Sequence, residues 1–166
     1  MYWPIVIILA LLVCGSVLWV GQALRRLAFC REQVSAAWRQ LSDELSARRE
    51  MMPYIVSAVP VSAAQLVEAI GNACDLASHV SGVRESAQAE ARLTMSMKRL
   101  FALLDAEPAE GGNVNRLRGK LDEIETRIDW LRDCYNRQAE TFNALLKRGP
   151  ARLLAHLPTV RQAELF

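Results

Sequence analysis

Hydrophobic and charged positions divide the chain into an apolar start and a mixed remainder. Nineteen of the first 24 residues are apolar, and none of the 24 is Asp, Glu, Lys or Arg. Residues 2–24 would form a helix about 34 Å long, which can cross the roughly 30 Å hydrocarbon core of a bilayer. Trp3 and Trp19 stand near its two ends, where indole rings favour the membrane interface. The pattern predicts a transmembrane anchor over residues 1–24.

Two other interpretations of this apolar segment fit less well. A cleavable signal peptide has a charged start and a shorter apolar core, whereas no Lys or Arg precedes this run. A lipoprotein would carry a small residue before its modified cysteine, and Val13 precedes Cys14. We therefore expect the anchor to stay uncleaved.

Positive charge beside the span predicts its orientation. Within twenty residues after the span the chain has four arginines, Arg25, Arg26, Arg31 and Arg39, and none precedes it. Because Lys and Arg gather on the cytoplasmic side, we expect a single-pass inner-membrane protein with its N-terminus outside and its C-terminal domain in the cytoplasm. Four cysteines without pairing-like spacing suit that reducing compartment: Cys14, Cys30, Cys74 and Cys134.

After the span, apolar residues recur with helical spacing in four stretches. The first contains Val34, Trp38, Leu41, Leu45 and Met52. Since no Gly or Pro lies between Gln22 and Met52, the membrane helix is expected to continue to Pro53, which should end or kink it. The second stretch contains Ile55, Val59, Leu66, Ile70 and Ala73, and the third contains Leu93, Met97, Leu100 and Leu104.

The fourth stretch is the most regular. Its apolar seam alternates steps of three and four residues, as in a coiled coil: Val114, Leu117, Leu121, Ile124, Ile128, Leu131, Tyr135, Gln138, Phe142 and Leu145. Gly149 and Pro150 should stop this helix. Breaks are also expected between Ser78 and Gly82 and at residues 107–112, which read Glu-Pro-Ala-Glu-Gly-Gly.

These stretches predict an all-α fold. Helices with short connections pack as antiparallel neighbours, so we expect an N-terminal transmembrane helix continuous with an antiparallel up-and-down bundle of about four helices. The predicted organisation is an anchor over residues 1–24, a helical bundle domain over 25–149 and a C-terminal tail over 150–166.

A search for chemistry in the sequence finds little. The only histidines are His79 and His156, without ligand-spaced partners, and no Glu-x-x-His pair, phosphate loop or Gly-x-Ser-x-Gly elbow occurs. A net charge of +2 without a basic cluster gives no nucleic-acid footprint. We expect no catalytic residues, no metal, no cofactor, no nucleic-acid partner and no small-molecule substrate.

Two polar features stand out against the apolar seams. Continuing from Leu45 in steps of three and four, the first seam reaches Arg48 and then Met52. Either Arg48 enters the core and pairs there, or the bundle ends and its charge reaches water. Beside the fourth seam runs a polar stripe, which is either a solvated face or a layer that fixes the register of a neighbouring helix: Glu125, Asp129, Arg132, Asn136 and Asn143.

Three ordered blocks of the sequence resemble the LemA family of bacterial membrane proteins. The first runs from Val34 through Trp38, Leu41 and Leu45 to Arg48-Arg49-Glu50-Met51-Met52-Pro53, and the second is Leu100 to Leu104-Asp105-Ala106-Glu107-Pro108. The third contains Glu125, Ile128, Arg132, Tyr135-Asn136, Phe142-Asn143, Pro150 and Ala155. The resemblance covers roughly residues 5–160, and it departs from the family at the tail around Leu157-Pro158-Thr159-Val160.

The resemblance implies a single-span helical-bundle protein without established catalysis. Its signature positions in this sequence are Trp38, Arg48, Pro53, Glu125, Arg132, Tyr135, Asn136 and Asn143. We expect a membrane-anchored interaction or scaffold protein that contacts protein partners or itself through its helices. The alternatives are a component of membrane stress signalling or envelope quality control, or a factor that remodels membranes or builds organelles.

The resemblance and the seam together suggest one specific contact. Arg48 and Glu125 both match family blocks, and the seam spacing directs Arg48 inward. We therefore expect the guanidinium of Arg48 to be held by the carboxylate of Glu125 on the fourth helix.

Overall fold

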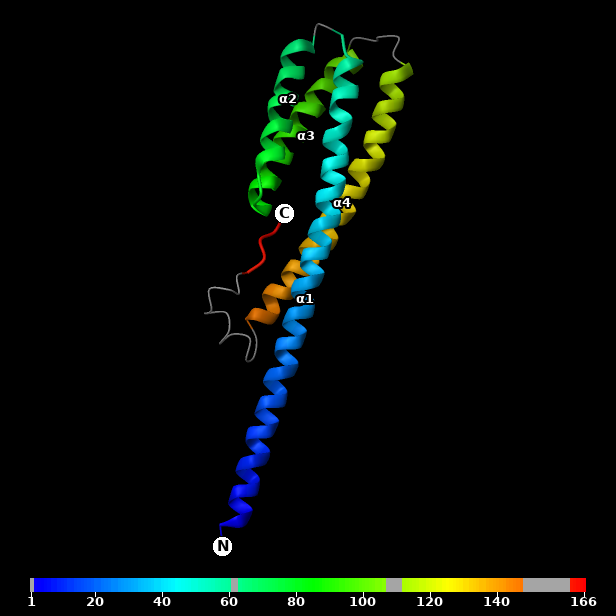
Figure 1. Ribbon diagram of the computed structural model, residues 1–166. Helices are drawn as coiled ribbons and strands as arrows, with labels where there is room; N and C mark the ends of the chain where they lie inside the picture. The colour runs from blue at the N-terminus through cyan, green and yellow to red at the C-terminus, as the bar shows by residue number, and fades with distance from the viewer. Residues whose placement is uncertain (1, 61–62, 107–111, 148–161) are drawn as a thin grey trace. The chain divides into compact units, whose positions relative to one another are not determined.

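The computed structural model describes residues 2–60, 63–106, 112–147 and 162–166. Its elements are four helices, α1 (Trp3–Ser57), α2 (Ala64–His79), α3 (Val83–Ala106) and α4 (Gly112–Leu146), drawn in Figure 1. The fold is an up-and-down helical bundle with a long apolar N-terminal helix, so the predicted all-α architecture is confirmed. The predicted stop at Gly149 and Pro150, the tail over 157–160 and His156 lie outside the described residues.

The chain forms two compact units. Unit 1 comprises Met1–Ala36 and Arg137–Ala163, and unit 2 comprises Ala37–Asn136 and Glu164–Phe166. In unit 2, all four helices contribute to one apolar core, whose best buried members are Met52, Ile55, Ala63, Ile70, Ala73, Leu93, Met97, Leu100 and Leu121. Within this unit α2 packs along α3 (Figure 1). The break expected between Ser78 and Gly82 is the connection at residues 80–82.

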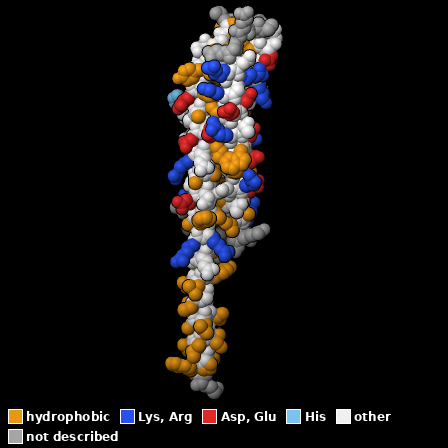
Figure 2. Space-filling view, turned by 90° about the vertical axis from the view of Figure 1, so that its right-hand side faces the viewer, with side chains coloured by type: hydrophobic (Ala, Val, Ile, Leu, Met, Phe, Trp, Pro, Cys, Tyr) orange, Lys and Arg blue, Asp and Glu red, His pale blue; other side chains and the backbone are white. Residues whose placement is uncertain are grey.

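Unit 1 has a small core and a long exposed apolar surface. Leu27 of α1 packs with Phe142 and Leu146 of α4. Every residue from Tyr2 to Val20 is exposed, and Figure 2 shows hydrophobic side chains covering this N-terminal part of α1. The helix is long and apolar enough to cross a membrane. Protein packing does not bury this surface, because none of its apolar window lies inside the structure.

Pro53 does not end the first helix, contrary to one of the two outcomes expected from the sequence. Helix α1 continues through Pro53 to Ser57. A proline inside a helix removes one backbone hydrogen bond, and packing of the flanking turn offsets that loss. Met52 and Ile55 are each buried in the core of unit 2, on either side of Pro53.

The buried face of α4 drifts away from the predicted seam. Leu121, Ile124, Ile128, Leu131 and Tyr135 are buried as expected. Further along, the predicted Phe142 is buried, but the other buried positions are Ala139 and Leu146, whereas the predicted Gln138 and Leu145 are only half-buried. A straight helix has 3.6 residues per turn, so it drifts by about 20° per heptad from a strict 3.5 repeat. The prediction of Gln138 and Leu145 as core positions was therefore wrong by one residue.

This shift predicts different tolerances at adjacent positions. Ala139 is fully buried, so Ala139→Leu should lower the free energy of unfolding by about 1–3 kcal/mol through overpacking. The matched change Gln138→Leu should cost less than about 0.5 kcal/mol, because position 138 is only half-buried. Denaturant unfolding of the detergent-solubilised full chain, followed by circular dichroism, checks both. A larger loss in the free energy of unfolding for Gln138→Leu than for Ala139→Leu would support the strict heptad register and contradict the shift.

Candidate functional site

The side chain of Arg48 lies in the interior of unit 2. The buried positions of α1 there are Ala37, Leu41, Leu45, Arg48, Met52 and Ile55, so Arg48 occupies a core position of the seam. Only 2% of the residue is exposed. This placement excludes the alternative in which the bundle ends before Arg48 and its charge reaches water.

Glu90 of α3 is the buried partner of this charge. Its carboxylate accepts from Nη2 of Arg48 through one oxygen and from Nη1 of Arg49 through the other. Glu90 is itself only 4% exposed. One buried carboxylate therefore joins two adjacent guanidinium groups of α1 to α3.

Thr94 and Glu125 complete the polar cluster around Arg48. Nη1 of Arg48 donates to Oε1 of Glu125 at 2.8 Å and to Oγ1 of Thr94 at 3.1 Å. The Thr94 hydroxyl in turn donates to the carbonyl of Glu90 at 3.0 Å. The expected contact between Arg48 and Glu125 is thus present, and two arginines balance two carboxylates.

The partners of Arg48 differ in their access to water. The side chain of Glu125 is 30% exposed, against 5% for Glu90. Among the described residues, Nε of Arg48 has no hydrogen-bond partner. Buried ions need excellent geometry and further hydrogen bonds to offset desolvation. Glu90 therefore offsets more of the desolvation cost of the Arg48 guanidinium than Glu125 does.

Sequence reasoning missed Glu90, although a signal for it exists. The third predicted seam consists of Leu93, Met97, Leu100 and Leu104. Extended backward by one step of three residues, the same seam reaches Glu90. A carboxylate at a seam position of α3 is the natural complement of an arginine at a seam position of α1, since neither charge can be buried alone.

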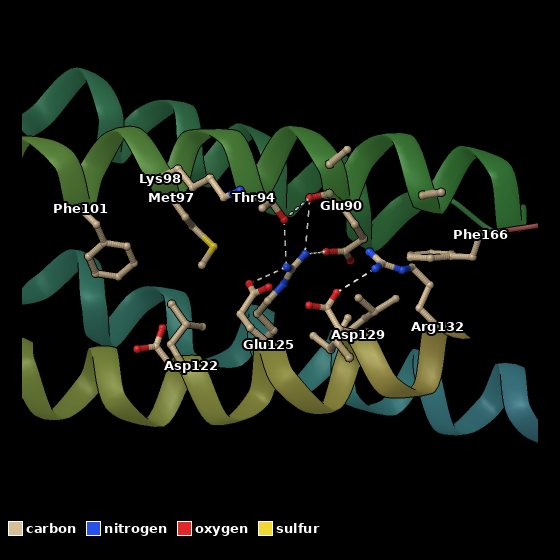
Figure 3. Close-up of a pocket in the computed structure, with 16 residues that line it drawn as sticks. Glu90, Thr94, Met97, Lys98, Phe101, Asp122, Glu125, Asp129, Arg132 and Phe166 are labelled. Atoms are coloured by element: carbon tan, nitrogen blue, oxygen red, sulfur yellow. Dashed lines mark hydrogen bonds and ion pairs between the residues drawn. The ribbon is translucent and has the colours of Figure 1, made fainter. Parts of the chain in front are cut away.

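A groove opens between α3 and α4 above this cluster. Its volume is about 730 Å³, and Arg48 and Leu45 of α1 line it together with residues of the two flanking helices. Figure 3 shows Met97, Lys98 and Phe101 on the α3 side. Asp122, Glu125, Asp129 and Arg132 line the α4 side, and Phe166 lies at one end. The groove therefore combines an apolar surface with charges of both signs.

The polar stripe of α4 has two different roles. Asp129 and Arg132 pair with each other, with Nη2 3.1 Å from Oδ1, and both line the groove. Asn136 and Asn143 instead bind backbone groups of residues 163–166 with their amides. The layer against a neighbouring helix that the sequence suggested is thus found at Glu125 and not at the two asparagines.

Trp38 and Tyr135, two further signature positions, pack against each other in unit 2. Their ring centroids are 5.6 Å apart. The Tyr135 hydroxyl donates to the carbonyl of Glu164 at 2.7 Å. Burial raises the pKa of the Tyr135 phenol, and the charge of Glu164 raises it further, so the hydroxyl remains a donor at neutral pH. Pro53 is exposed and joins none of these contacts.

Two further groups, the Asp105 carboxyl and the Cys74 thiol, have shifted pKa values. A hydrogen bond from Arg118 lowers the pKa of the Asp105 carboxyl, and the two groups form a bidentate pair at 2.7 and 3.3 Å. Burial raises the pKa of the Cys74 thiol, and the charge of Glu90 raises it further. Within the described residues no group of three or more His, Cys, Asp or Glu is placed to hold a metal ion.

Comparison with family models matches the sequence to one of them. A model of the LemA family matches residues 37–166, which include the whole of unit 2. The chain belongs to the LemA family. The LemA match begins at the first residue of unit 2, so the apolar N-terminal segment lies outside it, and it extends to Phe166. No curated protein matches the chain.

The arginine cluster yields a prediction for stability. Arg48→Met or Glu90→Gln should each lower the free energy of unfolding by about 3–5 kcal/mol, because each leaves a buried charge without its main partner. Glu125→Gln should cost less, about 1–3 kcal/mol, since water can reach its site. The double variant of Arg48 and Glu90 should lose much less than the sum of the single losses. Denaturant unfolding of the full chain measures all four.

A surface ion pair of the same unit serves as the control. Arg127 of α4 lies 3.6 Å from Glu44 of α1, and its side chain is 59% exposed. Arg127→Gln should therefore cost under about 1 kcal/mol. Losses at Arg48 and Glu90 as small as this one, and additive, would contradict a buried and coupled cluster.

The thiol of Cys74 reports on the charge of Glu90. Because that negative charge raises the pKa of Cys74, Glu90→Gln should lower the thiol pKa and shift the pH profile of iodoacetamide alkylation to lower pH. The measurement uses Cys74 as the single cysteine of the chain. Glu85→Gln, an exposed acid on the same helix, should leave the profile unchanged. An unchanged profile for Glu90→Gln would mean that the two groups do not interact.

Proposed function

We propose that this LemA-family protein is a membrane-anchored helical bundle that works through contacts with other proteins and not through catalysis. The exposed apolar surface of α1 is the observation that carries the membrane part of the proposal. Fifteen large apolar residues between Tyr2 and Leu24 are exposed. Burying a side chain of this kind is worth about 1.5–3 kcal/mol, so their exposure to water would cost on the order of tens of kcal/mol. Insertion of this segment into the hydrocarbon core of a bilayer would remove these side chains from water.

The arginines that follow the apolar segment support one orientation. Arg25, Arg26, Arg31 and Arg39 are all exposed on α1. At the inner surface of a bacterial membrane they would meet anionic lipid, which attracts basic residues next to a span. The proposal therefore places the bundle in the cytoplasm, held near the bilayer.

The interior polar groups of unit 2 support a structural role rather than a chemical one. Arg48, Arg49, Glu90 and Glu125 are engaged with one another. The groove above them is where a partner has both apolar surface and charges to bind, since Met97 and Phe101 line its α3 side and Asp122 and Asp129 line its α4 side. A partner bound there would bury apolar area and match the rim charges, as protein interfaces do.

Reporter fusions after Phe166 test the membrane topology. The full chain fused to a fluorescent protein should fluoresce, and the same chain fused to alkaline phosphatase should be inactive, because the rule for basic residues keeps this end inside. Replacing Arg25, Arg26 and Arg31 by Gln should weaken that bias. An active phosphatase with a dark fluorescent fusion would overturn the orientation.

Site-specific photocrosslinking in native membranes tests the interaction role. A benzophenone amino acid at Lys98, which lines the groove, should give discrete adducts of defined mass. The same group at Met95, an exposed position of the same helix that does not line the groove, should give none of these adducts. Identical adducts, or no adducts at either position, would contradict the groove as the contact surface.

A further inference from the structure

The segment Glu164–Phe166 is bound to the helices of unit 2 as a peptide ligand would be. The side-chain amide of Asn136 pairs with the backbone of Phe166 in both directions, accepting from its N–H at 2.9 Å and donating to its carbonyl at 3.0 Å. Tyr135 donates its hydroxyl to the carbonyl of Glu164 at 2.7 Å. These three bonds hold the backbone of Glu164 and Phe166 against α4.

Two side chains of the segment add sequence preference. The carboxylate of Glu164 accepts from the backbone N–H of Arg84 at 3.4 Å, in the first turn of α3, where a negative charge is favoured. The ring of Phe166 lies 5.8 Å from the ring of Trp38. Leu165 between them is exposed. The bound pattern is therefore an acidic residue, a free position and an aromatic residue.

We propose that this surface, formed by Trp38, Arg84, Tyr135 and Asn136, is a docking site for the 164–166 segment of a second copy of the chain. The inference rests on the proposed function, because it names one partner for an interaction module. A second copy carries the same Glu-x-Phe sequence, so it can make every contact that the chain's own segment makes.

Competition between the two segments decides which one is bound. The chain's own segment has the advantage of a high effective concentration. Four hydrogen bonds and one ring contact hold residues 164–166 in unit 2, and these three residues belong to no helix. Copies confined to one membrane meet at high local concentration, and exchange of segments then links them without any new interface.

Two complementary full-length variants test the exchange. In the acceptor, Phe166→Ala weakens the segment and leaves the docking site intact. In the donor, Asn136→Ala breaks the site and leaves the segment intact. Co-expressed with different tags and extracted in mild detergent, donor and acceptor should co-purify severalfold more than two donors or two acceptors do. Equal recovery of the three pairs would overturn the proposal.

Matched variants separate docking from folding. Leu165→Ala in place of Phe166→Ala should give no enrichment, because Leu165 is exposed. Tyr135→Phe keeps the ring and removes only the hydroxyl that binds Glu164. Used as the donor chain in place of Asn136→Ala, it should give a smaller enrichment with the acceptor. If neither the Tyr135→Phe chain nor the Asn136→Ala chain is enriched with the Phe166→Ala acceptor, and all chains have wild-type helicity, the second-copy proposal is overturned.

A labelled peptide tests whether the docking site binds the segment, separately from whether a second copy supplies it. The peptide of residues 162–166 should bind the Phe166→Ala chain in a fluorescence-anisotropy titration, and the same peptide with Ala in place of its Phe should not. Binding of the peptide without co-purification of donor and acceptor would make the segment an internal anchor only, and would overturn the second-copy proposal. Crosslinking from Lys98 is done in the chain with its native 164–166 segment, so its result tests the interaction role separately from the exchange of segments.

Discussion

A positive charge that cannot reach water constrains the bundle. The guanidinium of Arg48 is buried among α1, α3 and α4, and removing such an ion from water costs several kcal/mol unless opposite charges and hydrogen bonds replace the water. Glu90 on α3 and Glu125 on α4 replace it. Helices α1, α3 and α4 must therefore meet at one level in unit 2, because a shift by one turn of any of them would separate a charge from its partner.

The same constraint shapes the surface above the cluster. Glu90 is shared with Arg49, so two consecutive residues of α1 are tied to α3, while Glu125 of α4 binds Arg48 and remains partly open to solvent. The charged cluster lies at the floor of the groove, and Met97 and Phe101 supply apolar area on its α3 side. The charged cluster that joins the helices thus also forms part of the groove surface that a partner could contact. This suits a family member whose proposed work is binding rather than chemistry.

Local periodicity predicted the helices and the inward direction of Arg48, because both depend on spacing along one segment. It placed Gln138 rather than Ala139 in the core, since a 3.5-residue repeat was applied to a helix that follows 3.6. It missed Glu90 because this charged residue lies one step before Leu93, the first apolar residue of the third seam. It could not supply the partners of Asn136 and Asn143, which are backbone groups of a non-helical segment. Backbone partners leave no pattern of side chains in the sequence.

The distance between α3 and α4 in unit 2 tests most directly whether the buried charge sets the arrangement. Spin labels at Met95 and Trp130, both exposed, in a chain whose native cysteines are replaced by Ser, report that distance by double electron–electron resonance. The native cluster should give one narrow distribution. Arg48→Met, which keeps the bulk of the side chain and removes its charge, should broaden or shift the distribution. An unchanged narrow distribution in the Arg48→Met chain would show that apolar packing alone positions the two helices, and would contradict the account.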